Sequence, residues 1–161
     1  MKKVIENRFL KLISGGLSFF YTVGLCYVFF FARRRWREFP VRNFNIVPLQ
    51  KKIHYLESWS QFTGPEKAEI YKDVLVNIII FIPFPFLLVF LLGFRSYRRL
   101  LFLSCISSMG VELIQFIMNV GVADIDDILF NTIGATVGII MMYIIAQLRG
   151  SRETINYRVA R

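Results

Sequence analysis

Four long apolar stretches constrain the fold of this chain more than any other feature of its 161 residues. Each approaches or exceeds the roughly 18 to 20 apolar residues that a helix needs to cross the hydrocarbon core of a bilayer. A soluble helix is rarely apolar all round over several turns, because one face must meet water. The sequence therefore predicts an all-α integral membrane protein, a four-transmembrane-helix bundle with spans at residues 12–32, 74–94, 100–120 and 128–148.

A single membrane domain over residues 1–161 is expected, since the chain is too short for two sizeable domains. The loop at residues 33–73 is polar and joins the first two spans. In it, Ile53, Leu56 and Trp59 recur every three residues. This spacing predicts a short helix in the interface between membrane and water.

Two prolines, Pro83 and Pro85, fall in the middle of the second span. Each removes a backbone hydrogen-bond donor, so a kink or local unwinding is expected there.

The net charge of +9 arises from Lys and Arg residues that flank the apolar stretches, where such side chains anchor helices to headgroups. The chain shows no basic helix or base-stacking motif, so no nucleic-acid partner is expected. Basic residues are denser at the two termini and in the Arg95–Arg99 link than in the loops of the other side, which predicts cytoplasmic termini. The Arg33–Arg37 run, directly after the first span, argues against this orientation.

Ionisable and amide side chains cluster near one end of three predicted spans. Inside a membrane a charged side chain costs about 2.5–3.5 kcal/mol on insertion scales, so each one needs a structural or functional reason. The second span begins, the third ends and the fourth begins on the same membrane side, so these groups should lie at similar depths. The predicted ligand-binding residues are Asn77, Glu112, Gln115, Asp124, Asp126, Asp127 and Asn131.

Two interpretations of this cluster remain open at the level of sequence. The groups could simply hydrogen-bond the helices together, or they could form a site for a polar ligand. Gly134 and Gly138, spaced as a small-xxx-small pair, would let the fourth span approach a neighbour closely. Glu112 and Asp127 are the candidate catalytic residues if the protein is an enzyme. The carboxylates could also hold a hard cation such as Mg²⁺ or Ca²⁺, but the sequence identifies no cofactor.

With these motifs, the chain resembles the VanZ-like family of bacterial membrane proteins. The resemblance is carried by four strings: Asn45 to Pro48, Val76 to Phe84, Glu112 to Phe116 and Asp124 to Gly138. The last of these, in which an Asp-rich opening leads into a membrane helix, is the most specific.

The chain departs from the family pattern at two positions. Many relatives have Gly where Pro85 stands, and many have Arg where Gly121 stands. If that Arg pairs with carboxylates in relatives, Arg42 of the first loop is a candidate substitute here.

The resemblance implies a multi-pass protein of the bacterial cytoplasmic membrane that reduces susceptibility to lipoglycopeptide antibiotics such as teicoplanin. The first functional hypothesis is a binding protein, whose polar pocket at the outer interface takes a membrane lipid, a lipid-linked cell-wall precursor or the lipoglycopeptide. The second is a membrane-embedded enzyme that modifies a lipid-linked cell-wall substrate, with Glu112 and Asp127 as an acid/base pair or metal site. The third is a small transporter, which four spans without a repeat would support only as a homodimer.

Overall fold

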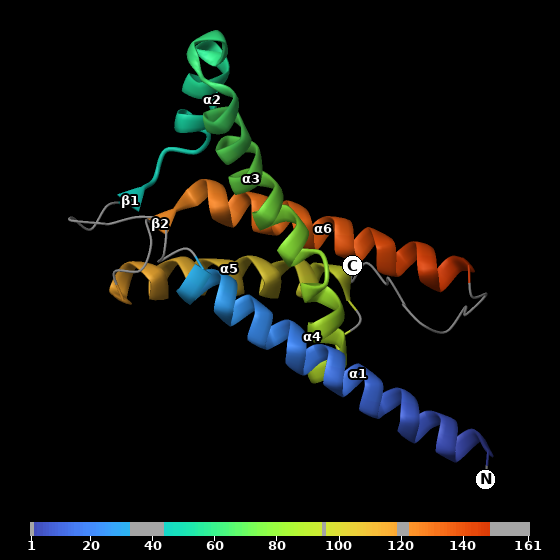
Figure 1. Ribbon diagram of the computed structural model, residues 1–161. Coiled ribbons are helices and arrows are strands. Elements are labelled where there is room, and N and C mark those ends of the chain that lie inside the picture. The colour runs from blue at the N-terminus through green and yellow to red at the C-terminus, as the bar shows by residue number, and fades with distance from the viewer. Residues whose placement is uncertain (1, 33–43, 95, 119–122, 149–161) are drawn as a thin grey trace.

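A computed structural model describes residues 2–32, 44–94, 96–118 and 123–148 of the chain. Helices make up most of this part (Figure 1). The elements are α1 (Lys2–Tyr27), the π-helical η1 (Val28–Ala32), β1 (Phe44–Asn45), α2 (Gln50–Glu57), the 3₁₀ turn η3 (Trp59–Gln61), α3 (Gly64–Phe81), α4 (Phe84–Leu92), α5 (Tyr97–Met118), β2 (Ala123–Asp124) and α6 (Ile125–Leu148). The sequence features at Arg33–Arg37, Arg42, Arg95 and Gly121 lie outside the described residues.

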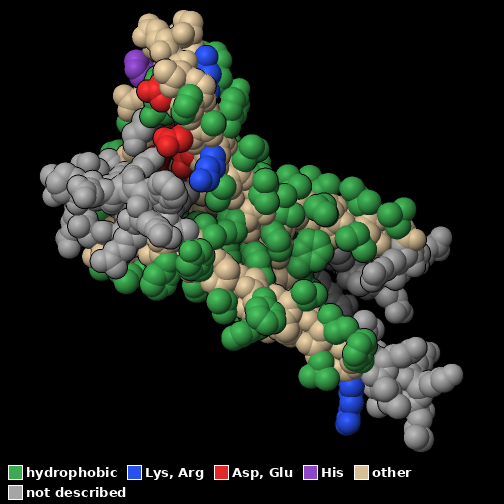
Figure 2. All heavy atoms as spheres, viewed as in Figure 1, with side chains coloured by type: hydrophobic (Ala, Val, Ile, Leu, Met, Phe, Trp, Pro, Cys, Tyr) green, Lys and Arg blue, Asp and Glu red, His purple; other side chains and the backbone are tan. Residues whose placement is uncertain are grey.

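Four helical segments of the described chain are long and apolar enough to cross a membrane. They are Lys11–Phe31, Gly64–Leu92, Tyr97–Met118 and Ile125–Leu148. Apolar side chains cover most of their outward surface, as Figure 2 shows, whereas the acidic and basic side chains in that view gather toward the ends of the molecule. An apolar exterior on a helical bundle suits contact with lipid tails. The predicted fold class, an all-α membrane bundle, is confirmed.

Helix α3 begins at Gly64, earlier than the start of the second span predicted at residue 74. The reason is local: Thr63 and Glu66 form a capping box, in which the backbone N–H of Thr63 donates to Glu66 Oε2 at 2.8 Å. Pro65 occupies the first turn, where a missing N–H costs nothing. The helix therefore starts in the polar loop and enters the apolar stretch only after two to three turns.

The two prolines of the second span divide it into α3 and α4. Helix α3 ends at Phe81, and Pro83 stands immediately before the first residue of α4, Phe84. The carbonyl of Pro83 accepts the backbone N–H groups of Phe86 and Leu87 at 3.1 and 3.2 Å, so a new helix starts at once. The predicted interruption at Pro83 and Pro85 is confirmed.

The helices are arranged so that the end of α5, the start of α6 and the strands β1 and β2 lie at the same end of the bundle (Figure 1). In Figure 1, α5 and α6 lie side by side and α3 crosses α6, and α6 packs against both helices. The start of α1 and the end of α6 point to one end of the molecule, whereas β1 and β2 lie at the other. The end of α5 and the start of α6 meet at that second end, as the predicted topology requires.

Close packing of α6 on α3 depends on two glycines. A Cβ atom built on Gly134 would overlap the carbonyl oxygen of Ile78, and one built on Gly138 would overlap the carbonyl oxygen of Ile82. Small residues at such crossings let two backbones approach each other in a membrane. The predicted close approach is confirmed, and its partners are Ile78 of α3 and Ile82, the residue that follows α3.

We expect Gly138→Ala to destabilise the protein by about 1–3 kcal/mol, because the new methyl group meets backbone rather than a flexible side chain. Gly110→Ala in α5 is the matched control, since a Cβ there has no neighbour within 4 Å. Thermal or denaturant unfolding of the purified variants measures both effects. Equal stability of the two variants would contradict the described α3–α6 crossing.

Candidate functional site

Polar side chains fill the interior at the end of the bundle that carries β1 and β2, and extend along the α5–α6 seam. Each is at most 5% exposed. On α5 they recur every three or four residues, and on α6 the same spacing continues into the two glycines, so each helix buries one polar face. We call this set the polar cluster: Asn77, Ser104, Ser108, Glu112, Gln115, Asp126, Asp127 and Asn131.

Two side-chain hydrogen bonds join the membrane helices through this cluster. Asn77 Nδ2 of α3 donates to Asp127 Oδ1 of α6 at 2.6 Å. Asn131 Nδ2, one turn along α6, donates to Ser108 Oγ of α5 at 2.8 Å. Both bonds are buried, and a buried polar group that loses its partner costs about 1–3 kcal/mol. The cluster therefore fixes how α3, α5 and α6 are rotated against one another.

Two carboxylates hold the start of α6, those of Glu112 and Asp124. Glu112 Oε2 accepts the backbone N–H of Asp124 at 3.1 Å, which ties α5 to the residue preceding α6. Asp124 Oδ1 then accepts the N–H of Asp126 at 3.0 Å, the arrangement of a helix N-cap. Asp126 and Asp127 both lie in the first turn, where the helix dipole favours negative charge.

Helix α1 reaches the cluster through its last turns. Gln115 Nε2 donates to the carbonyl oxygen of Phe29 at 2.8 Å, within η1, the π-helical stretch that follows α1. Further along α1, Tyr21 Oη donates to the carbonyl oxygen of Ile80 at 2.6 Å. These bonds connect α1 to α5 and α3, although most of α1 faces outward.

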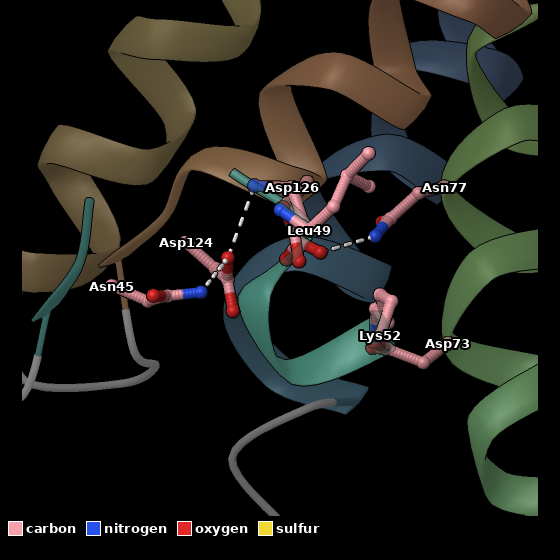
Figure 3. Close-up of polar contacts among 8 residues, drawn as sticks. Asn45, Leu49, Lys52, Asp73, Asn77, Asp124 and Asp126 are labelled. Atoms are coloured by element: carbon pink, nitrogen blue, oxygen red, sulfur yellow. Dashed lines mark hydrogen bonds and ion pairs between the residues drawn. The ribbon is translucent and has the colours of Figure 1, made fainter. Parts of the chain in front are cut away.

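The first loop is fastened at two points to the segment where α6 begins (Figure 3). Asn45 Nδ2 donates to Asp124 Oδ1 at 2.9 Å, beside the parallel pairing of β1 with β2. The backbone N–H of Leu49 donates to Asp126 Oδ1 at 2.6 Å. The first loop and the start of α6, which are far apart in sequence, are thereby held together at the end of the bundle that carries β1 and β2.

Leu49 has a left-handed backbone conformation, with φ of 60°. A residue with a Cβ atom pays about 1–2 kcal/mol for this conformation. The bond from its N–H to the buried carboxylate of Asp126 stabilises it, and Leu49 O in turn accepts the N–H of Ile53 as α2 begins. Lys52 of α2 forms an ion pair with Asp73 of α3, with Nζ and Oδ2 2.5 Å apart.

A depression of about 600 Å³ opens on this fastened segment. Val47, Pro48 and Ile53 give it apolar walls, and its polar lining comes from Gln50, His54 and Glu57. The short helix predicted in the first loop is present here as α2. The depression lies on the loop beside the cluster, whereas the sequence placed the expected pocket among the carboxylates and amides themselves.

Three buried oxygen atoms of the cluster accept no hydrogen bond from any residue that the structure describes. They are Asp126 Oδ2, Gln115 Oε1 and Asn131 Oδ1. Buried acceptors are usually satisfied by protein, ordered water or a bound ion. No group of three or more His, Cys, Asp or Glu residues within the described ranges is placed to hold a metal ion.

All seven sequence-predicted site residues lie at this end of the bundle, but they do not face a single point. Asn77 contacts Asp127, and Glu112 and Asp126 both contact Asp124. Asn131 and Gln115 direct their amide groups elsewhere, to Ser108 and to the end of α1. Their role in ligand binding remains a prediction.

The sequence-based site lacked several residues that the structure adds. Asn45, Leu49 and Lys52 fasten the first loop, and Tyr21 joins α1 to α3. Asn45 lies in one of the strings that carry the family resemblance, and this position was the only sign in the sequence that it could belong to the site. Leu49 contributes only its backbone N–H, for which a sequence gives no signal.

Fold and site together define a small multi-pass membrane protein whose spans are joined by buried polar groups at one end. A sequence model of the VanZ/LLP1 family matches residues 18–146, and the chain belongs to this family. It is 28% identical over 134 residues to Protein VanZ of Enterococcus faecium, a stretch that covers 80% of this chain and 73% of that protein. No solved structure matches the chain. The resemblance seen in the sequence motifs is confirmed.

We expect Leu49→Gly to be more stable than Leu49→Ala by about 1 kcal/mol, because only glycine adopts the left-handed conformation without strain. Both changes delete the leucine side chain and keep the N–H that donates to Asp126. The difference in unfolding free energy between the two variants therefore isolates the backbone term. An alanine variant as stable as the glycine variant would contradict the conformation described for Leu49.

Proposed function

We propose that this protein reduces susceptibility to teicoplanin-type lipoglycopeptides by binding a lipidated ligand at the outer face of the bacterial cytoplasmic membrane. The ligand is a membrane lipid, a lipid-linked cell-wall precursor or the drug itself. Membership of the VanZ/LLP1 family supports the link to this phenotype. Among the functions compatible with a small membrane bundle, it is the one that the site supports best.

The observation that carries this proposal is the depression on residues 47–57. Ligand sites are typically concave and mostly apolar, with a few polar groups that set orientation. Val47, Pro48 and Ile53 offer apolar contact, while His54 and Glu57 can meet a polar or charged group. A ligand that has both an acyl chain and a polar part matches this combination.

Rigid support strengthens the proposal. The depression is carried by a short loop helix, which alone would be marginal in water. The residues just before α2 are held to the carboxylates of Asp124 and Asp126, through the side chain of Asn45 and the backbone of Leu49. Helix α2 itself is held to α3 by the ion pair of Lys52 with Asp73. A surface fixed in this way binds with less loss of conformational entropy.

The orientation in this proposal has the termini in the cytoplasm. It is supported by the density of Lys and Arg at the termini and in the Arg95–Arg99 link. The start of α1 and the end of α6 lie at the end of the molecule opposite to β1 and β2 (Figure 1). In this orientation the depression and the polar cluster lie toward the outer leaflet.

An enzymatic role is the second candidate, favoured by the burial of Glu112 and Asp127, each at most 5% exposed. Glu112 accepts a backbone N–H at the start of α6, and Asp127 accepts the amide of Asn77. Both carboxylates therefore stabilise the packing of the helices, which favours the binding role over the enzymatic one.

Expression in a teicoplanin-susceptible Gram-positive host tests the proposal. We expect the wild-type chain to raise the minimum inhibitory concentration of teicoplanin beyond assay error and to leave that of vancomycin, which lacks an acyl tail, unchanged. Ile53→Asn should abolish the increase, because residue 53 lines the depression. Leu56→Asn is the matched control, since Leu56 is 71% exposed on the same helix outside the depression.

Two further arms separate the alternatives in the same cells. Glu112→Gln keeps the shape of the side chain and removes its titratable charge, so persistence of resistance would exclude acid/base catalysis by Glu112. An impermeant thiol reagent should label a cysteine at Ala123 in intact cells, and labelling only after lysis would reverse the proposed orientation. Equal loss of resistance in the Ile53 and Leu56 variants would contradict a role for the depression.

A further inference from the structure

One face of α2 carries the polar lining of the depression. Gln50, His54 and Glu57 follow one another at spacings of four and three residues, so their side chains lie on the same side of the helix. All three residues are exposed, and none of their side chains forms a hydrogen bond or ion pair with any residue that the structure describes. These side chains are therefore free to meet the polar part of a ligand.

The formal charge of this lining is negative. Among the six residues that line the depression, Glu57 alone is charged when His54 is neutral. Glu57 is also the last residue of α2, where the carbonyl groups of a helix end favour a positive charge nearby. The carboxylate and the helix end act in the same direction, so a cationic group is favoured at this end of the depression.

Positive groups of the same segment are directed away from the depression or are already paired. Lys52, the α2 lysine whose side chain the structure describes, lies on the opposite side of the helix and pairs with Asp73 of α3 (Figure 3). Backbone N–H groups at the start of a helix can bind anions, but the N–H of Leu49 already donates to Asp126 at 2.6 Å. A phosphate group in the depression would find neither Lys52 nor this N–H available.

We propose that the depression takes an amphiphile with a protonated amine, whose ammonium group contacts Glu57 and whose acyl chain lies against the apolar walls. This inference rests on the proposed function, because it names the chemical class of the ligand at the same site. Gln50 and His54 can exchange hydrogen bonds with hydroxyl or amide groups beside the amine. A ligand whose polar part is a phosphate or pyrophosphate is disfavoured, because it brings negative charge next to that of Glu57.

The test uses the full chain in dodecyl maltoside micelles at pH 7, with protein-free micelles as the blank. Calorimetric titration compares three probes of one chain length: dodecylamine, which is protonated at this pH, dodecyl phosphate, and uncharged N-dodecylacetamide. We expect dodecylamine to bind about three- to tenfold more tightly than dodecyl phosphate, the size of effect of a partly exposed charge contact. The net charge of the chain, +9, would by itself favour the phosphate, so this order reports the local charge.

A pair of matched variants assigns the preference to the depression. Glu57→Gln keeps the size of the side chain and removes its charge, so the preference for the amine should disappear. Glu69→Gln removes the same charge from an exposed position of α3 outside the depression, and the wild-type preference should remain. Both residues are exposed, so neither change disturbs the packing of the bundle.

The three probes separate failure of this inference from failure of the proposed function. Equal affinity for all three, or tighter binding of the phosphate, would overturn the inference and leave a lipidated ligand at the depression. A preference for the amine that survives in Glu57→Gln would also overturn it, because the cationic group would then bind elsewhere. Binding of none of the probes would contradict the proposed function as well.

Competition against bound dodecylamine distinguishes the two sources of such a ligand. Displacement by teicoplanin would identify the lipoglycopeptide as the molecule that supplies the amine. Displacement by lysyl-phosphatidylglycerol in the same micelles would identify an aminoacylated membrane lipid. Displacement by neither would contradict the proposal, because a short-chain amine would then be the sole ligand of its class.

Discussion

Burial of polar groups inside an apolar bundle is the constraint on which the rest of this structure depends. A membrane interior offers no water to an amide or carboxylate, so each must find its partner on a neighbouring helix. Asn77 meets Asp127, and Asn131 meets Ser108, and these two bonds connect three of the four spans. Lipid tails are as apolar as the helices themselves, so hydrophobic burial alone would not choose one packing arrangement.

The close approach of α6 to α3 and the polar bonds depend on each other. Gly134 and Gly138 let the two backbones come together, and the two turns that precede them on α6 carry Asn131 and Asp127. Only at a short distance between the helices can the short side chain of Asn77 reach Asp127 at 2.6 Å. One face of α6 thus provides both the packing and the hydrogen bonds.

The same end of the bundle organises the first loop. Glu112 holds Asp124, the residue that precedes α6, and the carboxylates of Asp124 and Asp126 hold Asn45 and the strained backbone at Leu49. The depression on residues 47–57 therefore depends on groups buried in the membrane domain. The depression on residues 47–57 and the polar cluster beside it are parts of one arrangement.

Much of this arrangement could be predicted from the sequence. The clustered apolar residues gave four spans, Pro83 and Pro85 gave the interruption between α3 and α4, and the spacing of Gly134 and Gly138 gave the close contact. Each of these rests on a property of the residue type itself, such as a missing N–H or a missing Cβ atom.

The remaining features depend on how the helices are rotated about their axes and on where the first loop contacts the bundle. Which amide meets which carboxylate follows from helix rotation, so the direction of Gln115 toward Phe29 could not be predicted. The pairing of Asp126 with the backbone of Leu49 involves an N–H that nearly every residue has. The early start of α3 came from a capping box that a search for apolar residues does not detect.

A double-mutant cycle on Asn77 and Asp127 tests the central claim most directly. Unfolding free energies are measured for Asn77→Ala, Asp127→Ala and the double variant. If the buried bond joins α3 to α6 as described, the two changes should be coupled by about 1–3 kcal/mol. Additivity within about 0.5 kcal/mol would show that the two side chains do not interact and would contradict this account of the polar cluster.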